Sequence, residues 1–479
     1  MKRTLRWYDY LSLNIYWFAL TTRSQTLTPL IVPLLVQQFV GEGAKGTFVG
    51  QMRLWSLMIA LLVQALMGML SDRCMARWGR RRPFILVGTL GEVVVFVLIG
   101  FISGLEGMAG YWTLFVLYIF SMVSSNTAHA ATQGLIPDLV PEEKRGLASG
   151  IKALLELPVP LIFTSFVIGR LVGTGNLWAA LLALIGILVL CMLWAMWAPE
   201  VPLAEVPFAL DWQPFLRLLL MTGVFAAVIW GMGALVNLVM GLSVGLASGL
   251  SVWITGVVGL VGMAVAVGLG VWFSVRIGVG SFDRRNVSFT WWVVNRLAFM
   301  VGSTNLAGFM LYFLQEKFDL VQEEAAGPAS TVIMFVGVFI LVTALPSGWL
   351  SDRFGKKLLV AVSGLLAAVG TAIVVLIPSM VALYVGGCVI GAGVGLFYSA
   401  NWALGTEIVP QKQAGRYLGI SNLAGAGAGA VGAYIGGPIG DSIGYTPLMA
   451  VYGVLFVLSI FALQGVRVYG PKEKVVNAG

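Results

Sequence analysis

The sequence predicts an all-α, multi-pass membrane protein built from two pseudo-symmetric six-helix bundles plus two extra helices. Of its 479 residues, 59% are hydrophobic and only 10% are charged, whereas soluble domains carry about a quarter charged residues. Apolar segments long enough for a bilayer crossing, which needs about 20 residues, recur along the chain. A charged phrase also occurs twice, as GMLSDRCMARWGRRR at 68–82 and GWLSDRFGKK at 348–357.

The duplicated phrase indicates an internal repeat. Each copy joins two apolar segments and contains Ser-Asp-Arg, then glycine followed by consecutive cations. Hydrocarbon cannot solvate these charges, so both loops are expected in water at a membrane face. A loop repeated at matching positions of two halves is typical of many secondary transporters, which predicts that the chain moves a solute across a membrane.

About fourteen membrane helices are predicted, six in each half and two between the halves. The two extra apolar stretches, 216–242 and 247–275, hold almost no ionisable residue, and a re-entrant or interfacial hairpin is the alternative for this pair. The spans expected in the two halves are 9–38, 47–70, 84–104, 111–134, 147–171 and 176–198, then 289–315, 328–350, 357–377, 380–405, 414–436 and 445–466.

Four regions follow from this count. Residues 1–198 form the N-terminal bundle and residues 199–215 a proline-bearing cytoplasmic linker. Residues 216–287 hold the inserted helix pair and its loop, and residues 288–479 form the C-terminal bundle with a short cytoplasmic tail.

The basic residues predict the orientation. With the N-terminus inside, most of the 29 lysines and arginines fall in cytoplasmic segments, and the outside loops hold only Lys45 and Lys317. That asymmetry is what the positive-inside rule requires. Both termini are therefore expected in the cytoplasm of a cell-membrane protein. The apolar stretch behind the basic N-terminus is too long for the core of a cleavable signal peptide, so the first span is expected to remain.

Composition argues against other classes of protein. The net charge of +8 is interpreted as cytoplasmic anchoring rather than nucleic-acid binding, because the cations lie in short loops between spans. Cys74, Cys191 and Cys388 are far apart and form neither a metal-ligand spacing nor an obvious disulfide pair. The chain has no nucleotide-binding loop and no Ser/His/Asp grouping, so no enzymatic activity, metal or cofactor is expected.

The paired G-x-x-S-D-R…G-[RK]-[RK] loops resemble the loop between the second and third helices of each half in the major facilitator superfamily. The longer first copy, within the segment from Leu62 to Ile85, is similar to that of sucrose/proton symporters and related glycoside–cation symporters. NWALGTEIVP at 401–410 and GRYLGISNLAG at 415–425 also resemble bacterial members of that group. The resemblance implies a central cavity lined by the first, fourth, seventh and tenth helices.

The two charged loops are expected to act as a cytoplasmic latch. An acid at a helix end can meet the positive N-terminus of a neighbouring helix, and arginines can bridge to acidic groups. Simple positive-inside anchoring is the alternative for the arginines. The latch residues are Asp72, Arg73, Arg80, Arg81, Asp352 and Arg353.

An ionisable residue inside the membrane is a functional candidate by default. Arg23 lies about 20 Å from the cytoplasmic end of its helix and needs a carboxylate or a water-filled cavity. Glu156, at similar depth in the fifth span, is the expected partner, either as a structural ion pair or as a site where substrate or a proton competes. Coupling is assigned to Glu156 or Glu92 with His129 assisting, and Glu92 ranks second because its helix is peripheral in the family fold.

Polar residues on the expected cavity-lining helices are the candidates for substrate binding. Asn126, His129 and Gln133 are spaced by three and four residues and share one helix face, where His129 can relay protons or simply pack. Asn401 stands where related bacterial sequences often carry an acid. The candidates are Arg23, Gln25, Asn126, His129, Gln133, Asn295, Arg296, Tyr398, Asn401, Trp402 and Asn422.

The leading prediction is therefore a monomeric secondary transporter that carries a sugar or glycoside together with a proton or other cation by alternating access. An exporter or antiporter of amphipathic compounds is the alternative, favoured by the fourteen-helix count and by Asn401. A non-transporting pigment-delivery or assembly protein of the same fold is a third interpretation. The expected partners are a small solute, a proton and the lipid bilayer, and no nucleic acid.

Overall fold

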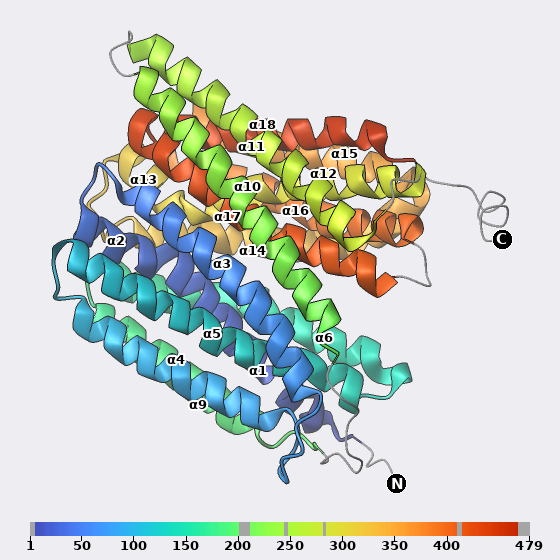
Figure 1. The fold of residues 1–479 in the computed structure, drawn as a ribbon. Helices are drawn as coiled ribbons and strands as arrows, with labels where there is room; N and C mark the ends of the chain where they lie inside the picture. The colour runs from blue at the N-terminus through green and yellow to red at the C-terminus, as the bar shows by residue number, and fades with distance from the viewer. Residues whose placement is uncertain (1–4, 201–210, 244–247, 281–283, 410–413, 468–479) are drawn as a thin grey trace. The chain divides into compact units, whose positions relative to one another are not determined.

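The computed structural model describes residues 5–200, 211–243, 248–280, 284–409 and 414–467, and every regular element in these ranges is helical (Figure 1). The chain divides into two compact units, 1–218 with 310–337 and 219–309 with 338–479. The predicted linker lies largely outside the described residues. The predicted region boundaries at 198, 215 and 287 stay predictions.

The first unit contains long helices and short, broken ones. Its first predicted span is interrupted at Pro29 by a π turn, and its fifth breaks at Leu157, just before Pro158. Both interruptions follow from proline, which lacks a backbone N–H and clashes with the preceding turn. The elements are α1 (Trp7–Thr26), η1 (Leu27–Ile31), α2 (Val32–Val40), α3 (Lys45–Ser71), α4 (Arg82–Ile102), α5 (Gly107–Leu139), η2 (Glu142–Lys144), α6 (Arg145–Glu156), α7 (Pro158–Phe163), η3 (Thr164–Ile168), α8 (Gly169–Gly173), α9 (Leu177–Ala195) and α13 (Met310–Phe318).

The second unit holds the remaining long helices and most of α14, whose first part belongs to the first unit. The glycine after α14, Gly355, adopts a φ of +92°, a backbone conformation open to glycine and strained for other residues. The elements are α10 (Gln213–Ser243), α11 (Ser248–Gly278), α12 (Arg284–Gly308), α14 (Ala326–Phe354), α15 (Lys356–Leu376), α16 (Met380–Ile408), α17 (Ala414–Ile443), α18 (Tyr445–Ala462) and η5 (Leu463–Gly465).

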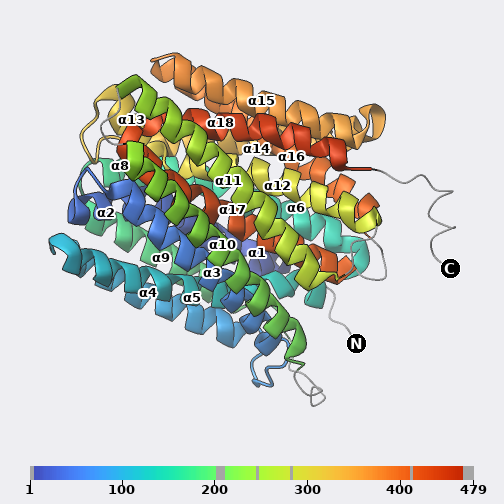
Figure 2. The ribbon, with the colours of Figure 1, turned by 45° about the horizontal axis from the view of Figure 1, so that its top comes forward.

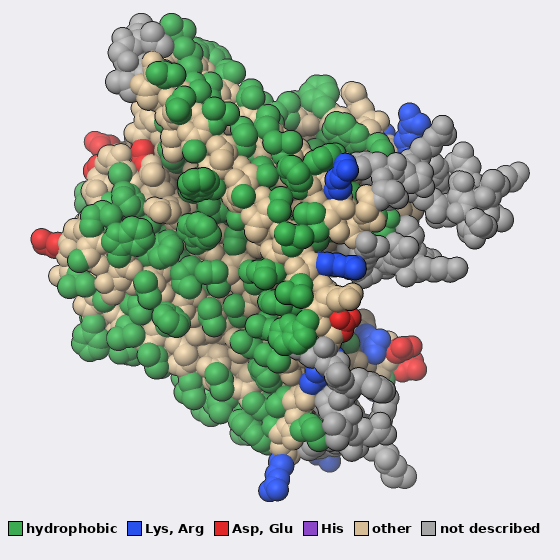
Figure 3. Space-filling model, in the orientation of Figure 1, with side chains coloured by type: hydrophobic (Ala, Val, Ile, Leu, Met, Phe, Trp, Pro, Cys, Tyr) green, Lys and Arg blue, Asp and Glu red, His purple; other side chains and the backbone are tan. Residues whose placement is uncertain are grey.

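The predicted membrane helices are confirmed as helices. In the described residues, 11 helices are long and apolar enough to cross a bilayer, and α12 with α13, bent by 57°, makes a twelfth when counted as one span. The other two predicted spans, 9–38 and 414–436, coincide with α1–η1–α2 and α17. The all-α multi-pass architecture is therefore confirmed. Figure 3 shows a face dominated by hydrophobic side chains, with lysines and arginines at its margin, as lipid contact requires.

The extra pair, α10 and α11, packs against α17 within the second unit. The two helices run alongside each other in Figures 1 and 2. The Phe225 ring of α10 lies over Gly270 of α11 and Gly427 of α17, where an added Cβ would come within 2.0 and 2.2 Å of that ring. Each helix is long and apolar enough to cross a membrane. The pair is thus held by close glycine contacts of the kind that membrane helices use.

Candidate functional site

A buried charged cluster joins α1, α4 and α5 in the first unit. Nε of Arg23 donates to Oε1 of Glu92 at 2.5 Å, and the Ser121 hydroxyl donates to the same oxygen at 2.7 Å. The Arg23 guanidinium also donates to the Ser121 hydroxyl through Nη2. Arg23 and Glu92 are 4% and 2% exposed and Ser121 is fully buried. The three side chains therefore form one network in which both charges are compensated.

The prediction that Arg23 pairs with Glu156 is wrong. Glu156 lies 3.5 Å from Nζ of Lys152 one turn away on α6, and its side chain is 37% exposed. Its charge is balanced within its own helix. Glu92, which the sequence analysis ranked second, is the partner. It also accepts a hydrogen bond from Ser121, because α4 packs closely on α5. At Gly88, an added Cβ would lie 2.5 Å from the backbone oxygen of Ser124.

The Glu92 carboxylate is incompletely satisfied. Its Oε2 atom is buried and has no hydrogen-bond partner among the described residues, whereas Oε1 accepts two bonds. One turn earlier on α4, Thr89 shares a 2.6 Å hydrogen bond with the Tyr16 hydroxyl of α1. A buried carboxylate oxygen without a partner is costly when ionised. Oε2 is therefore an atom where a proton can be accepted.

His129 lies in a second group, around the Trp17 ring. The two rings meet edge to face at a centroid distance of 5.1 Å, and Nζ of Lys152 lies 3.8 Å from the Trp17 ring centroid. Asn126 and Gln133, which were predicted to share a helix face with His129, form hydrogen bonds with other residues. Asn126 donates to the Met122 backbone of its own helix, and exposed Gln133 accepts from Gln64 at 3.3 Å. Gln25, on α1, is half-buried.

A second polar cluster joins α12, α16 and α18 in the other unit. Nη1 of Arg296 donates to Oδ1 of Asn401 at 3.2 Å, and Nδ2 of Asn401 donates to Oδ1 of Asn295 at 2.8 Å. Asn295 in turn donates to the Ser459 backbone at 2.8 Å. The Trp292 indole donates to the backbone oxygen of Asn401 at 3.0 Å. Three of the predicted binding residues, Asn295, Arg296 and Asn401, are thus brought together.

Aromatic residues flank this cluster. The Trp402 ring lies 5.5 Å from the Arg296 guanidinium carbon, within cation–π range. Trp402 and Tyr398 are 41% and 38% exposed, and their spacing of four residues on α16 places them on one face. The Asn422 side chain lies outside the described residues.

The first charged loop is anchored to its own unit by arginines. Nε of Arg81 lies 2.9 Å from Oδ2 of Asp138 at the end of α5, and Nη2 pairs with Asp72. Arg81 also donates to the Ser71 hydroxyl at 2.6 Å. Arg80 pairs with Asp138 as well. Arg73 follows Asp72 in the turn after α3.

A carboxylate beyond α9 completes the attachment of this loop. Glu200 accepts hydrogen bonds from the backbone amides of Arg81 and Arg82, at 2.6 and 3.2 Å. Burial raises the pKa of the Glu200 carboxyl, although the hydrogen bonds from these two amides lower it. The loop therefore rests on backbone contacts as well as on side-chain charges.

Among the described residues, the second loop makes fewer ion pairs than the first. Lys356 pairs with Glu407 near the end of α16, and Lys357 donates to the Val466 backbone at 3.0 Å. Asp352 is exposed, and Arg353 lies 5.4 Å from the Trp349 ring centroid.

Three acids that hold these loops were not among the predicted residues: Asp138, Glu200 and Glu407. Two of them carry a recognisable signal. The fourth helix of each half ends in the same pattern, Asp138-Leu-Val-Pro in the first half and Glu407-Ile-Val-Pro in the second, so the repeat could have identified both acids. Glu200 stands in a segment with no counterpart in the second half, and no such signal marks it.

Substitution of Arg81 is expected to destabilise the protein more than substitution of Arg80. Arg81→Lys should lower the free energy of unfolding by about 1–2 kcal/mol, because one ammonium cannot replace a guanidinium that contacts Asp72, Asp138 and Ser71. Arg80→Lys, at a more exposed position, should cost about 0.5 kcal/mol. Thermal unfolding of the purified variants measures both. Equal losses would contradict the structural role of Arg81.

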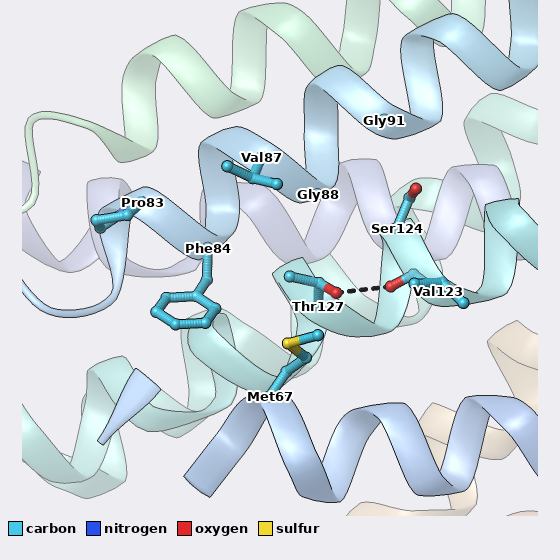
Figure 4. Close-up of a pocket in the computed structure, with 9 residues that line it drawn as sticks. All are labelled: Met67, Pro83, Phe84, Val87, Gly88, Gly91, Val123, Ser124 and Thr127. Atoms are coloured by element: carbon cyan, nitrogen blue, oxygen red, sulfur yellow. Dashed lines mark hydrogen bonds between the residues drawn. The ribbon is translucent and has the colours of Figure 1, made fainter. Parts of the chain in front are cut away.

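An apolar crevice of about 350 Å³ lies between α3, α4 and α5 (Figure 4). Its lining holds no ionisable side chain, and the Thr127 hydroxyl donates to the Val123 backbone of its own helix. Val87 on its rim is 64% exposed. Such a crevice suits a hydrocarbon chain better than a polar solute. The lining residues are Met67, Pro83, Phe84, Val87, Gly88, Gly91, Val123, Ser124 and Thr127.

A protein-family model matches nearly the whole chain. The model of the Major Facilitator Superfamily matches residues 10–314 and also 292–478. A sucrose transport protein of Oryza sativa subsp. japonica is 31% identical over 107 residues, 19% of this chain and 20% of that protein. A minor myo-inositol transporter of Bacillus subtilis (strain 168) is 30% identical over 119 residues, 25% of this chain and 27% of that protein. The matches thus span about a fifth to a quarter of these relatives.

Solved structures match over almost the full length. The crystal structure of a nucleoside transporter, NupG, aligns with a TM-score of 0.65 and 14% identity, over 96% of this chain and 99% of that one. A peptide transporter of the POT type, in complex with sulfate, aligns with a TM-score of 0.65 and 14% identity, over 97% and 95%. At this identity the likeness shows the fold alone.

Proposed function

This chain belongs to the major facilitator superfamily, and on that premise we propose that it is a secondary active transporter that carries a sugar-like solute together with a proton by alternating access. The local similarity to sucrose and inositol transport proteins supports a polyhydroxylated solute. The observation that supports proton coupling is the buried Arg23–Glu92–Ser121 network, in which one carboxylate oxygen of Glu92 has no hydrogen-bond partner among the described residues.

The network can link a proton to conformation. A proton on Glu92 would remove the negative charge that balances Arg23, and the guanidinium would then need another partner. Because Arg23, Glu92 and Ser121 stand on three different helices, α1, α4 and α5, that change acts on the packing between them. Only groups whose interactions differ between two conformations can couple a proton to a movement.

Proton-driven uptake tests the proposal. In proteoliposomes, an inward proton gradient should drive accumulation of a labelled sugar or polyol, and a protonophore should abolish it. Glu92→Gln should reduce accumulation at least about tenfold, the effect of removing about 1.4 kcal/mol of coupling free energy, while solute exchange without a gradient continues.

Glu156→Gln separates the two acids. Glu156 is half-exposed and pairs within its own helix, so this variant should keep gradient-driven accumulation. If wild-type uptake is indifferent to the gradient, proton symport is wrong. If Glu156→Gln abolishes coupling and Glu92→Gln does not, the assignment to Glu92 is wrong. Efflux of amphipathic dyes without any sugar uptake would identify an exporter instead.

A further inference from the structure

The Arg296 guanidinium is a buried positive charge without a counter-charge in the described part of the chain. Arg296 is 8% exposed, about 18 Å along α12 at 1.5 Å per residue. The ion pairs within 4 Å among the described residues do not include it. Its hydrogen-bond acceptor there is the neutral amide of Asn401 at 3.2 Å, and its buried Nε donates to no described atom.

The neighbouring groups hold Arg296 in position without neutralising it. The Asn401 side chain is fixed between Arg296 and Asn295, and its backbone oxygen accepts from the Trp292 indole at 3.0 Å. Asn401 and Asn295 are both fully buried. The amide oxygen of Asn401 therefore faces Arg296, and its amide nitrogen faces Asn295.

Arg23 provides the internal comparison. It also lies deep in a membrane helix, but Glu92 balances its charge at 2.5 Å. A buried charge costs several kcal/mol unless it is paired. In contrast to Arg23, Arg296 carries a buried positive charge that no described residue balances, and a bound anion is the partner that would remove the excess.

Accessible aromatic groups mark where a ligand can reach the cluster. The Trp402 ring lies 5.5 Å from the guanidinium carbon, and Trp402 and Tyr398 are 41% and 38% exposed although they flank a buried arginine. The Arg296 guanidinium is planar, and its Nε–H has no partner among the described residues. Such a group suits a planar acceptor with two oxygens, such as a carboxylate. An aromatic face suits the C–H surface of a sugar ring.

We propose that the solute is a sugar acid, and that its oxyanion, best a carboxylate, binds Arg296 beside Trp402. This inference rests on the proposed transport function and narrows its substrate class from neutral sugars to polyhydroxylated anions. The carboxylate supplies the charge that the protein does not, and the amide of Asn401 holds the guanidinium in place.

Binding to the purified full-length protein in lipid nanodiscs tests this inference separately from transport. Glucuronate and gluconate should raise the unfolding temperature in a saturable way, whereas glucose and myo-inositol should do so only at far higher concentrations. Glucose 6-phosphate shows whether a phosphate group on the sugar can replace the carboxylate. Sodium acetate and sodium sulfate show whether an oxyanion without a sugar ring is sufficient for binding.

Variants that change the charge at Arg296 or Asn401 test whether this charge binds the ligand. Arg296→Gln should weaken glucuronate binding about 30-fold or more, the loss typical of removing one partner of a buried charge pair. Asn401→Asp, nearly identical in shape, should weaken it by a similar factor, because an internal carboxylate would then neutralise Arg296. Arg296→Lys should retain part of the affinity for glucuronate, because the positive charge remains.

Two results of the binding measurements would overturn the inference. One is glucose or inositol binding as tightly as the acids. The other is glucuronate affinity unchanged in both Arg296→Gln and Asn401→Asp. Gradient-driven uptake of a neutral sugar that ignores these variants would leave the proposed symport standing and reject the sugar acid. Glucuronate binding that depends on Arg296, in a protein without gradient-driven uptake, would support the inference and reject proton symport.

Discussion

Replacing Glu92 with leucine alone is expected to lower the free energy of unfolding by about 3–5 kcal/mol. The loss comes from Arg23, which would stay buried without a counter-charge. Arg23→Leu should cost a similar amount, because it strands the carboxylate in the same way. The double variant with leucine at both positions should recover most of the loss, since replacing a whole buried ion pair by apolar groups is often neutral.

Reversible unfolding by sodium dodecyl sulfate, titrated into dodecyl maltoside micelles, measures these differences. The matched control is Glu156→Leu, because Glu156 pairs with Lys152 at a half-exposed position. That variant should cost less than about 1 kcal/mol. Additive losses in the double Arg23/Glu92 variant would show that the two side chains do not act as a pair in the membrane.

Much of the fold follows from simple physics of the sequence. Helical spans were predictable because hydrocarbon leaves the backbone few alternatives to the helix, and long apolar runs such as that of α9 admit one interpretation. The breaks at Pro29 and Leu157 were predictable because proline interrupts the hydrogen-bond ladder whatever surrounds it.

The side-chain partners were harder to predict, since they depend on which helices touch. Depth along a helix placed Arg23 and Glu156 at similar levels, but depth alone does not say which face a residue presents. Glu156 instead meets Lys152 on the preceding helical turn of α6. Glu92 on α4 meets Arg23 of α1 and also Ser121 of α5, where α4 and α5 approach closely. The signal for that approach lay in Gly88 and Gly91, which have no side chain to hold the helices apart.

For the Arg296 cluster, the predicted residues do lie together in the structure. Asn295, Arg296 and Asn401 were expected near each other only from the resemblance to a known family, and the structure joins them by direct hydrogen bonds. Neither periodicity nor composition relates α12 to α16, which are more than 70 residues apart in the chain. The sequence did show an amide, Asn401, at a position where related bacterial sequences often carry an acid. That this amide leaves the charge of Arg296 unbalanced follows only from the hydrogen bond between the two side chains.

Gly88→Val is expected to be strongly destabilising at the contact between α4 and α5. The added Cβ would stand 2.5 Å from the Ser124 backbone oxygen and 2.8 Å from the Ala128 backbone nitrogen, atoms that cannot move aside as a flexible side chain can. The α4–α5 contact must then open, at a cost of about 3 kcal/mol in the free energy of unfolding. Glu92 lies one turn further along α4, so its bond to Ser121 at 2.7 Å should also be lost.

Gly186→Val in α9 is the matched control, because an added Cβ there meets nothing within 4 Å. It should change the free energy of unfolding by about 0.5 kcal/mol or less. In uptake measurements, Gly88→Val should resemble Glu92→Gln, since both remove the carboxylate's contact with α5, whereas Gly186→Val should behave as the wild type. Gradient-driven accumulation that survives Gly88→Val would show that coupling does not require α4 and α5 to hold Glu92 against Ser121.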